Sequence, residues 1–573
     1  MFPLFLFRIS VFRAGAVAGA GALWLCLLSF GCTRSPEPAD LLLTNGIVHT
    51  LDAVQPVAQA VAIRDGRIVF VGAGGEAAAY RGPDSEVIDL AGKTVVPGFS
   101  DSHAHLSGIG AREMQLNLDT AGSVAELLER VREQAQKSEP GEWIVGRGWI
   151  EAQWDPPVFP TRWDLDKVSP QHPVWLVRAD GHAGVANSLA LRVIGVHKGV
   201  KDPPGGEILR DPKTGEPTGM LIDRAQSIIR RFLPEDTPER KRQALLLGVR
   251  RSLEMGWTQL GIAGNFYEEV ELLRSLYDAG EIPLRLYDAV GGPGPDADRI
   301  LREGPNIEGY GGLFTLRGIK LMADGALGSR GAALLEKYDD HDSNGLLMFE
   351  TDALLPLLER ALRAGVQVQT HAIGDRANRF VLDLYEEAFR RVPLGERKVA
   401  EPRWRIEHAQ ILAPPDIPRF AKLSVIASMQ PSHAITDLYF AKSRLGEERL
   451  AGAYAWRSLL DAGARLAGGS DAPVEKGDPL VEFYAAVTRK DLQGKSEQHW
   501  HAEQRVSREE ALKMLTLWAA YATFEESTRG SVAAGKWADL TVLSRDIMTV
   551  EESLIPQTRC EITIVAGKIA YRR

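Results

Sequence analysis

Hydrophobic and polar positions alternate in short runs at both ends of the chain. Between residues 40 and 97 the runs "DLLLTNGIVHTLD", "AVAIRDGRIVFVGA" and "SEVIDLAGKTVVPGF" indicate strands. The pairs Asn-Gly, Asp-Gly and Gly-Lys within them are typical of hairpin turns. The C-terminal runs "GKWADLTVLSRD" and "CEITIVAGKIAYRR" have the same character. Two strand-rich ends around a different middle predict one small composite β-sandwich, made of residues 40–97 and 525–573.

The middle of the chain, residues 98–524, repeats a strand-like and then a helix-like pattern. Amphipathic stretches such as "ALLPLLERALRAG" and "ANRFVLDLYEEAFRRV" separate several apolar runs. Eight units of this kind predict an α/β fold, a (β/α)8 TIM barrel, with its active site at the carboxyl ends of the strands. The strand-like runs are "VVPGFSDSHAH", "GWTQLGIAG", "IPLRLYDAV", "FTLRGIKLMADG", "GVQVQTHAIGD", "RWRIEHAQ", "LSVIASMQP" and "ARLAGGSDAP".

The connection after the first of these strands is unusually long. It covers about residues 112–240, which is too long for one strand-to-helix connection. It also contains two strand-like runs of its own, "EWIVGRGW" and "PVWLVRADGH". We therefore expect an inserted subdomain in the barrel.

Residues 1–32 have the pattern of an export segment. Arg8 and Arg13 precede the uncharged stretch "AGAVAGAGALWLCLLSFGC". Its end resembles a bacterial lipoprotein signal, in which Cys32 becomes the lipidated first residue, although Leu28 lies one place further from this cysteine than is usual. A cleaved signal peptide and an uncleaved anchor are the alternatives. We expect an exported protein, a cell-envelope lipoprotein or a periplasmic protein, with membrane contact only through this segment.

Composition narrows the classes of partner and site. The 573 residues are 45% hydrophobic and 25% charged, as in soluble globular proteins. A net charge of −9 without a basic block argues against nucleic acid as a partner. Of the three cysteines, only Cys560 lies outside the export segment. A single cysteine excludes a disulfide framework and a cysteine-based zinc site in the rest of the chain. The composition leaves open whether the protein forms a homo-oligomer.

Metal-ligating and acid/base residues stand at the ends of the predicted strands. One residue separates His103 from His105 in the first strand, and side chains alternate between the two faces of a strand, so both imidazoles point to the same face. Each candidate has a structural alternative by itself: a core histidine, a turn or cap aspartate, or a lysine that extends to solvent. Their common position at strand ends instead predicts one site in the barrel mouth. The others are Lys320, Asp324, His371, His408 and Asp471.

This set of residues and the sequence motifs around them resemble those of the amidohydrolase superfamily, in particular the amidohydrolase-3 branch that includes YtcJ-like proteins and N-substituted formamide deformylases. The similar strings are "VVPGFSDSHAH", "GWIEAQW", "LVRADGHAGVANSLAL", "GIKLMADGALGSRGAAL", "THAIGD", "RIEHAQ" and "GSDAPV". They extend over about residues 40–570.

The resemblance implies a metal centre. His103, His105 and Asp471 would bind one cation, and His371 and His408 a second. Lys320 would react with CO2 and bridge both as a carboxylated, anionic ligand; a mononuclear site is the alternative. An anionic bridge offsets the repulsion between two cations about 3.5–4 Å apart. Nitrogen and oxygen ligands suit Zn2+ first, and also Mn2+, Fe2+ or Co2+.

The resemblance also implies a reaction. The chain would be a metal-dependent hydrolase of carbon-nitrogen bonds other than peptide bonds, such as those of an N-substituted formamide (an N-formyl amine), an N-acyl amine or an N-acyl amino acid, in which a metal-bound hydroxide attacks a small amide-type substrate. Asp471 would act as base and then as acid. From the insertion His182 would be a catalytic or substrate contact, with Arg178 beside it, and Asp324 would be a further substrate contact. An esterase, lactonase or dipeptidase, or a non-catalytic envelope binding protein, are the alternatives.

Overall fold

The computed structural model describes residues 36–151, 154–178, 181, 183–203, 206–233, 237–492 and 500–573, with only the backbone of residue 223. The export segment with Cys32 lies outside the described residues. Among the described residues, no helix has the length and apolar character needed to span a membrane.

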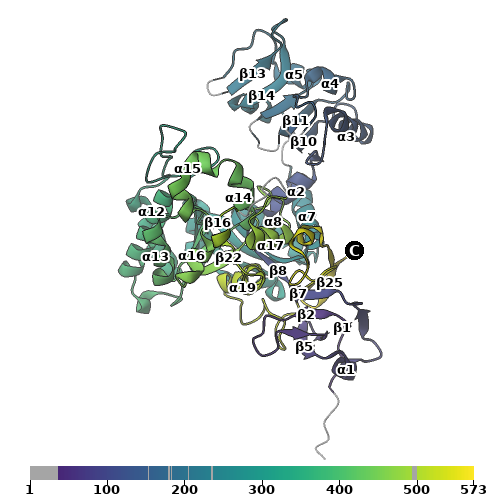
Figure 1. Ribbon diagram of the computed structural model, residues 1–573, viewed down its shortest axis with the longest axis vertical. Helices are drawn as coiled ribbons and strands as arrows, with labels where there is room; N and C mark the ends of the chain where they lie inside the picture. The colour runs from purple at the N-terminus through teal and green to yellow at the C-terminus, as the bar shows by residue number, and fades with distance from the viewer. Residues whose placement is uncertain are drawn as a thin grey trace, which may run out of the picture. The chain divides into compact units, whose positions relative to one another are not determined.

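Eight parallel strands in sequence order form the barrel, as predicted. Hydrogen bonds join them in the order β8 (Phe99–Ala104), β15 (Trp257–Asn265), β16 (Arg285–Gly291), β18 (Phe314–Met322), β19 (Gln367–Ala372), β20 (Arg405–His408), β21 (Ile426–Met429) and β22 (Arg465–Gly468). Helices alternate with these strands along the chain, among them α8 (Tyr267–Asp278), α9 (Pro295–Glu303), α11 (Thr351–Ala364), α12 (Asp375–Arg391), α13 (Ile417–Leu423) and α16 (Trp456–Asp461). Figure 1 shows α12 and α13 on the outer side of the strands. The two amphipathic stretches named above are α11 and α12.

The last strand returns to the first through the residues that follow it. The Asp471 N–H donates to the His103 carbonyl oxygen at 2.8 Å, and the His105 N–H donates to the Ala472 carbonyl oxygen at 2.9 Å. At Gly469 a Cβ atom would lie 2.7 Å from the His103 nitrogen, so only glycine permits this close approach. The ends of β8 and β22 are thereby held against each other at the barrel mouth.

The two ends of the chain form the predicted β-sandwich. One sheet has the order β5 (Arg67–Gly72), β4 (Ala60–Arg64), β1 (Leu41–Thr44) and β6 (Glu86–Asp89). The other has the order β25 (Lys568–Arg572), β24 (Cys560–Val565), β23 (Leu540–Leu543), β7 (Thr94–Pro97), β2 (Ile47–His49) and β3 (Val57–Ala58), so both termini share it. Apolar side chains of both sheets, such as Leu43, Val61, Val542 and Ile564, form one core.

Two of the three N-terminal hairpin predictions are wrong. Asp65-Gly66 does join the antiparallel pair β4 and β5, with φ of 51° and 75°. The Asn-Gly and Gly-Lys turns instead carry the chain from one sheet to the other, because β1 and β6 belong to the first sheet and β2 and β7 to the second. A positive φ, 56° at Asn45, serves a corner between sheets as well as a hairpin, so the turn residues alone do not distinguish them.

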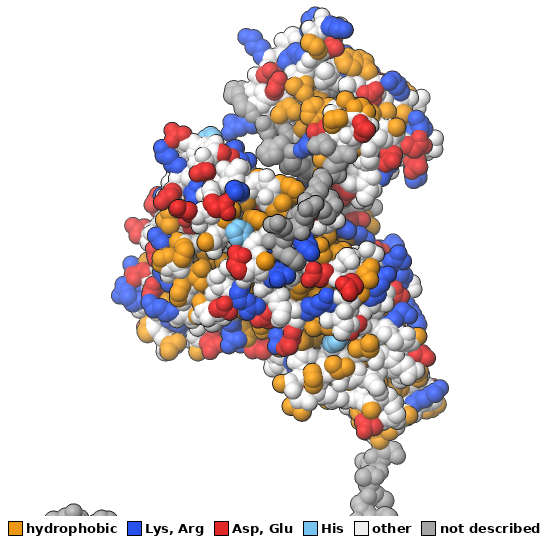
Figure 2. All heavy atoms as spheres, viewed as in Figure 1, with side chains coloured by type: hydrophobic (Ala, Val, Ile, Leu, Met, Phe, Trp, Pro, Cys, Tyr) orange, Lys and Arg blue, Asp and Glu red, His pale blue; other side chains and the backbone are white. Residues whose placement is uncertain are grey.

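The connection after β8 carries a separate sheet with its own core. Its order is β13 (Gly206–Arg210), β14 (Pro217–Asp223), β12 (Ala183–Ala186), β11 (Val174–Arg178), β10 (Ile144–Trp149) and β9 (Leu116–Asn117). Helices α3 (Val124–Lys137), α4 (Arg162–Asp166) and α5 (Ser188–Ile194) accompany it, and α2 (Leu106–Glu113) and α7 (Pro238–Met255) flank it in sequence. The two strand-like runs noted in the sequence correspond to β10 and β11. On the face in Figure 2, acidic and basic side chains are interspersed over the described surface.

Candidate metal centre

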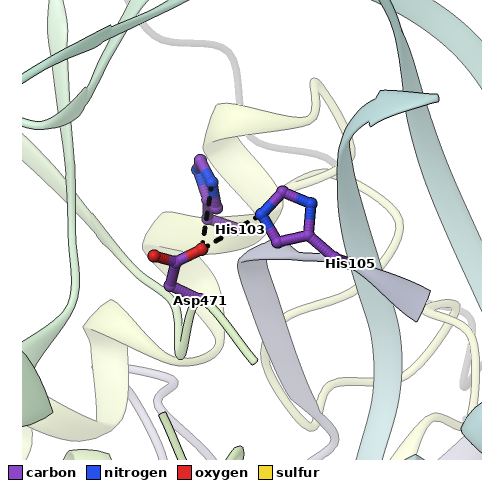
Figure 3. A group of neighbouring side chains, drawn as sticks. All are labelled: His103, His105 and Asp471. Atoms are coloured by element: carbon purple, nitrogen blue, oxygen red, sulfur yellow. Dashed lines mark hydrogen bonds and ion pairs between the residues drawn. The ribbon is translucent and has the colours of Figure 1, made fainter. Parts of the chain in front are cut away.

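Three of the expected ligands converge where the first and last barrel strands meet. One Asp471 carboxylate oxygen lies 3.2 Å from Nε2 of His105 and 3.5 Å from Nε2 of His103 (Figure 3). These three ligand atoms all lie within 4.8 Å of one another, a spacing that a single cation can occupy. The strand pattern that placed His103 and His105 on one face therefore gives the observed arrangement.

The other three expected ligands lie in the same cluster. Nζ of Lys320, at the end of β18, is 3.2 Å from Nε2 of His103. The His408 ring is 4.9 Å from the His103 ring and 4.5 Å from the His371 ring, between centroids. Six side chains from five strand ends thus surround one volume.

Buried partners fix the orientation of two of these imidazoles. Nδ1 of His103 lies 2.6 Å from a Glu407 carboxylate oxygen, and Nδ1 of His408 lies 2.8 Å from the Gln430 side-chain oxygen. An imidazole that donates from Nδ1 leaves Nε2 as the free ligand atom. Glu407 is itself paired with Arg405 at 2.6 and 2.9 Å, and both side chains are fully buried. This arrangement of orienting partners behind the ligands is typical of metal-binding histidines, so the residues present fit a bound cation.

Burial keeps His103 and His408 in the neutral form that a cation needs. Desolvation and then the Lys320 ammonium lower the pKa of His103 to about 4, and desolvation with the neighbouring His371 lowers the pKa of His408 well below its ordinary value. Burial also lowers the pKa of Lys320 to about 8. Desolvation alone would raise the pKa of Asp471, but the hydrogen bond with His105, together with the histidines around the carboxylate, holds it well below its ordinary range.

The cluster forms part of the wall of a cavity of about 970 Å3. Two further residues of the cavity wall, His433 and Glu475, were not identified from the sequence. His433 lies in α14 (Pro431–Thr436) just after β21, with Nε2 3.6 Å from Asp471 and 3.9 Å from Glu475. His408, His433 and Asp471 offer a second set of ligand atoms within 4.8 Å of one another. The position of "MQPSHAI" at the end of the seventh strand was the available signal.

The other three candidates are Asp324, Arg178 and His182. Asp324 is fully buried, and its carboxylate accepts hydrogen bonds from the backbone N–H groups of Ala333, Ile373 and Gly374 at 2.8, 3.0 and 2.9 Å. One of its oxygens also lies 3.3 Å from Nε2 of His371. Arg178, on β11 of the insertion, pairs with Glu151 at 2.7 Å. His182 lies outside the described residues.

Known proteins are similar to this sequence over nearly its full length. Protein LONG AFTER FAR-RED 3 of Arabidopsis thaliana is 36% identical, over 93% of this chain and 92% of its own. YtcJ of Bacillus subtilis is 33% identical, over 92% and 99%. The N-substituted formamide deformylase of Arthrobacter pascens is 32% identical, over 93% and 98%.

The three-dimensional comparison agrees with the sequence comparison. The crystal structure of an uncharacterized metal-dependent hydrolase from Pyrococcus horikoshii superposes with a TM-score of 0.69 and 27% identity, over 89% of this chain and 99% of that one. The sequence model of the amidohydrolase family, Amidohydro_3, matches residues 86–571, which include every strand of the barrel and all six converging side chains. The chain therefore belongs to the amidohydrolase family and has the fold of a metal-dependent hydrolase.

Proposed function

We propose that this protein hydrolyses carbon-nitrogen bonds other than peptide bonds, in N-acyl or N-formyl amines. The observation that supports it most is the convergence of the six expected side chains, five of which carry imidazole or carboxylate ligand atoms, on one wall of a cavity large enough for a small molecule. The relative named as an N-substituted formamide deformylase, 32% identical over 93% of this chain, supports this choice of bond.

Zn2+ is the cation we propose first, with Mn2+, Fe2+ and Co2+ as alternatives, because the cluster offers imidazole and carboxylate ligands. His103, His105 and Asp471 would hold one ion, and His371 and His408 a second. When bound, the cation supplies the Lewis acid that polarises an acyl carbonyl and lowers the pKa of water to about 7.

We also propose that Lys320 is carboxylated. Its ammonium is buried, and among the described residues it forms no ion pair with a carboxylate. A buried cation without a partner is costly, and here it would also repel bound metal ions. With a pKa of about 8 a substantial fraction of the side chain is the neutral amine, the form that adds CO2 and releases one proton.

The chain's own residues have distinct tasks in this reaction. Asp471 is ionised and lies between His105 and His433, where it can accept a proton from the attacking water and return it to the leaving amine. Glu407 and Gln430 hold the His103 and His408 rings in the orientation that exposes Nε2. Nε2 of His433 is buried without a hydrogen-bond partner in the described part of the chain, so it can donate to the acyl oxygen of the substrate.

A hydrolysis screen tests the proposal. Zinc-loaded protein should cleave members of a series of N-formyl, N-acetyl and longer N-acyl amines, and the metal content of the pure protein should be one or two ions per chain. A protein that holds well under one ion per chain, and does not recover after addition of Zn2+ and bicarbonate, would favour a non-catalytic binding role. Cleavage of esters or lactones alone would favour the other alternative.

A further inference from the structure

The loop after β18 brings positive charge to the cavity wall. Its residues 326–330 line the cavity, and Arg444 of α15 (Ala441–Arg449) lines it as well. Arg330 is part of "GALGSRGAAL", one of the strings that match the amidohydrolase pattern, yet a guanidinium cannot ligate a metal ion. Its presence on this wall therefore points to another ligand.

Arg330 and Arg444 share a single carboxylate. Nε and Nη2 of Arg330 donate to the two oxygens of Asp340 at 3.1 and 2.9 Å, and Arg444 contacts the same aspartate. Arg444 also donates to the Gly328 carbonyl oxygen at 3.3 and 3.2 Å, which ties the loop to α15. Two guanidinium groups against one carboxylate leave one net positive charge at this place.

One edge of the Arg330 guanidinium is available. Within the described part of the chain, Nη1 of Arg330 meets no hydrogen-bond acceptor, and 33% of the side chain is exposed. Asp340 holds the adjacent edge, formed by Nε and Nη2, so the group is already oriented and its Nη1/Nη2 end stays available. The backbone at Arg330 has a φ of 60°, a left-handed conformation that is uncommon for a non-glycine residue.

The rest of the wall suits an apolar group beside this charge. Met322, Leu327, Phe440 and Val474 contribute apolar surface to the cavity. The acidic wall residues have other partners: Asp437 accepts from Gln410 and Tyr454, each at 2.6 Å. Glu475 accepts from Thr436 at 2.7 Å, and Asp471 contacts His105 at 3.2 Å. A planar carboxylate matches the free edge of a guanidinium, where two parallel N–H groups point at its two oxygens.

We propose that Arg330 binds a substrate carboxylate, and that the preferred substrates are N-acyl derivatives of apolar amino acids rather than uncharged N-acyl amines. This inference rests on the proposed amidohydrolase function and specifies its substrate class.

Two compounds that differ only in the carboxylate test it: N-formylphenylalanine, as each enantiomer, and N-formylphenethylamine. With zinc-loaded wild-type protein we expect one enantiomer of the acid to have a kcat/KM at least about tenfold above that of the amine, as for a hydrogen bond to a charged group. R330Q should bring the ratio close to one, while R330K, which keeps the charge, should retain part of it. The ratio should also fall as salt is added.

The control is R360Q. Arg360 lies on α11, is exposed and pairs with Asp298 at 2.7 Å, away from the cavity-lining residues. This variant should leave the ratio as in wild type. A wild-type ratio near one, or a ratio that R330Q does not change, would overturn the inference.

Calorimetric titration of both compounds separates this inference from the proposed function. Binding of the acid that depends on Arg330, without hydrolysis of either compound, retains the carboxylate site and refutes the amidohydrolase. Hydrolysis of both compounds without preference retains the amidohydrolase and refutes the carboxylate site. If neither compound binds and neither is hydrolysed, the result counts against both the carboxylate site and the amidohydrolase.

Discussion

Glu407 offers the sharpest test of how the metal centre is supported. Its side chain is fully buried and accepts from Nδ1 of His103 at 2.6 Å and from Arg405 at 2.6 and 2.9 Å. Glu407→Gln removes the charge and leaves the buried Arg405 guanidinium without its counter-ion. Breaking a buried ion pair from one side costs about 3–5 kcal/mol, so the free energy of unfolding should fall by about that amount.

The same change should weaken metal binding separately. The neutral amide of glutamine is a poorer acceptor for the His103 N–H, and the loss of such a partner lowers metal affinity about 10- to 100-fold. Urea unfolding of the metal-free protein measures the first effect, and Zn2+ competition with a chelator measures the second. The double variant Arg405→Met, Glu407→Gln should recover much of the stability, because neither member of this pair is then charged, but not the zinc affinity.

A matched surface pair provides the control. Glu387 pairs with Arg390 and Arg391 on the exposed face of α12, and Glu387→Gln should leave both measurements unchanged. If Glu407→Gln kept wild-type stability and wild-type zinc affinity, the idea that this carboxylate orients His103 for a cation would be refuted.

Three further predictions concern neighbouring groups. Asp471→Asn should lower kcat by about 10²- to 10⁴-fold while a substrate still binds, measured by steady-state kinetics and calorimetry, because the amide cannot accept the proton; near-wild-type turnover would remove Asp471 from the reaction. Added CO2 should increase the metal content of the protein, and at a fixed concentration of dissolved CO2 this gain should be larger at pH 9 than at pH 7, because the Lys320 amine loses its proton around its pKa of about 8. The gain should be absent in Lys320→Met. A gain that does not depend on pH would contradict the carboxylation. Asp324→Ala should lower the free energy of unfolding by about 3 kcal/mol or more, since three buried N–H groups lose their acceptor; an unchanged urea midpoint would show that these bonds are replaced.

The sequence by itself determined the elements and the ligand types. Strand and helix periodicity is local, so the barrel strands, α11 and α12 could be predicted from short windows, and "HAH" at the end of a strand already placed two imidazoles on one face. The parallel barrel topology then brings the carboxyl ends of all eight strands to one mouth, which is why six ligands spread from His103 to Asp471 could be expected to meet.

Only the tertiary structure decided which groups support and extend the site. The contact between His103 and Glu407 joins residues 304 positions apart, and Asp340 joins Arg330 to Arg444. His433 reaches the cavity from the turn of helix after β21, and the turns at Asn45 and Gly92 pass between sheets rather than within one. These relations depend on how distant segments pack and on which buried donors and acceptors then face each other, and no local periodicity records that.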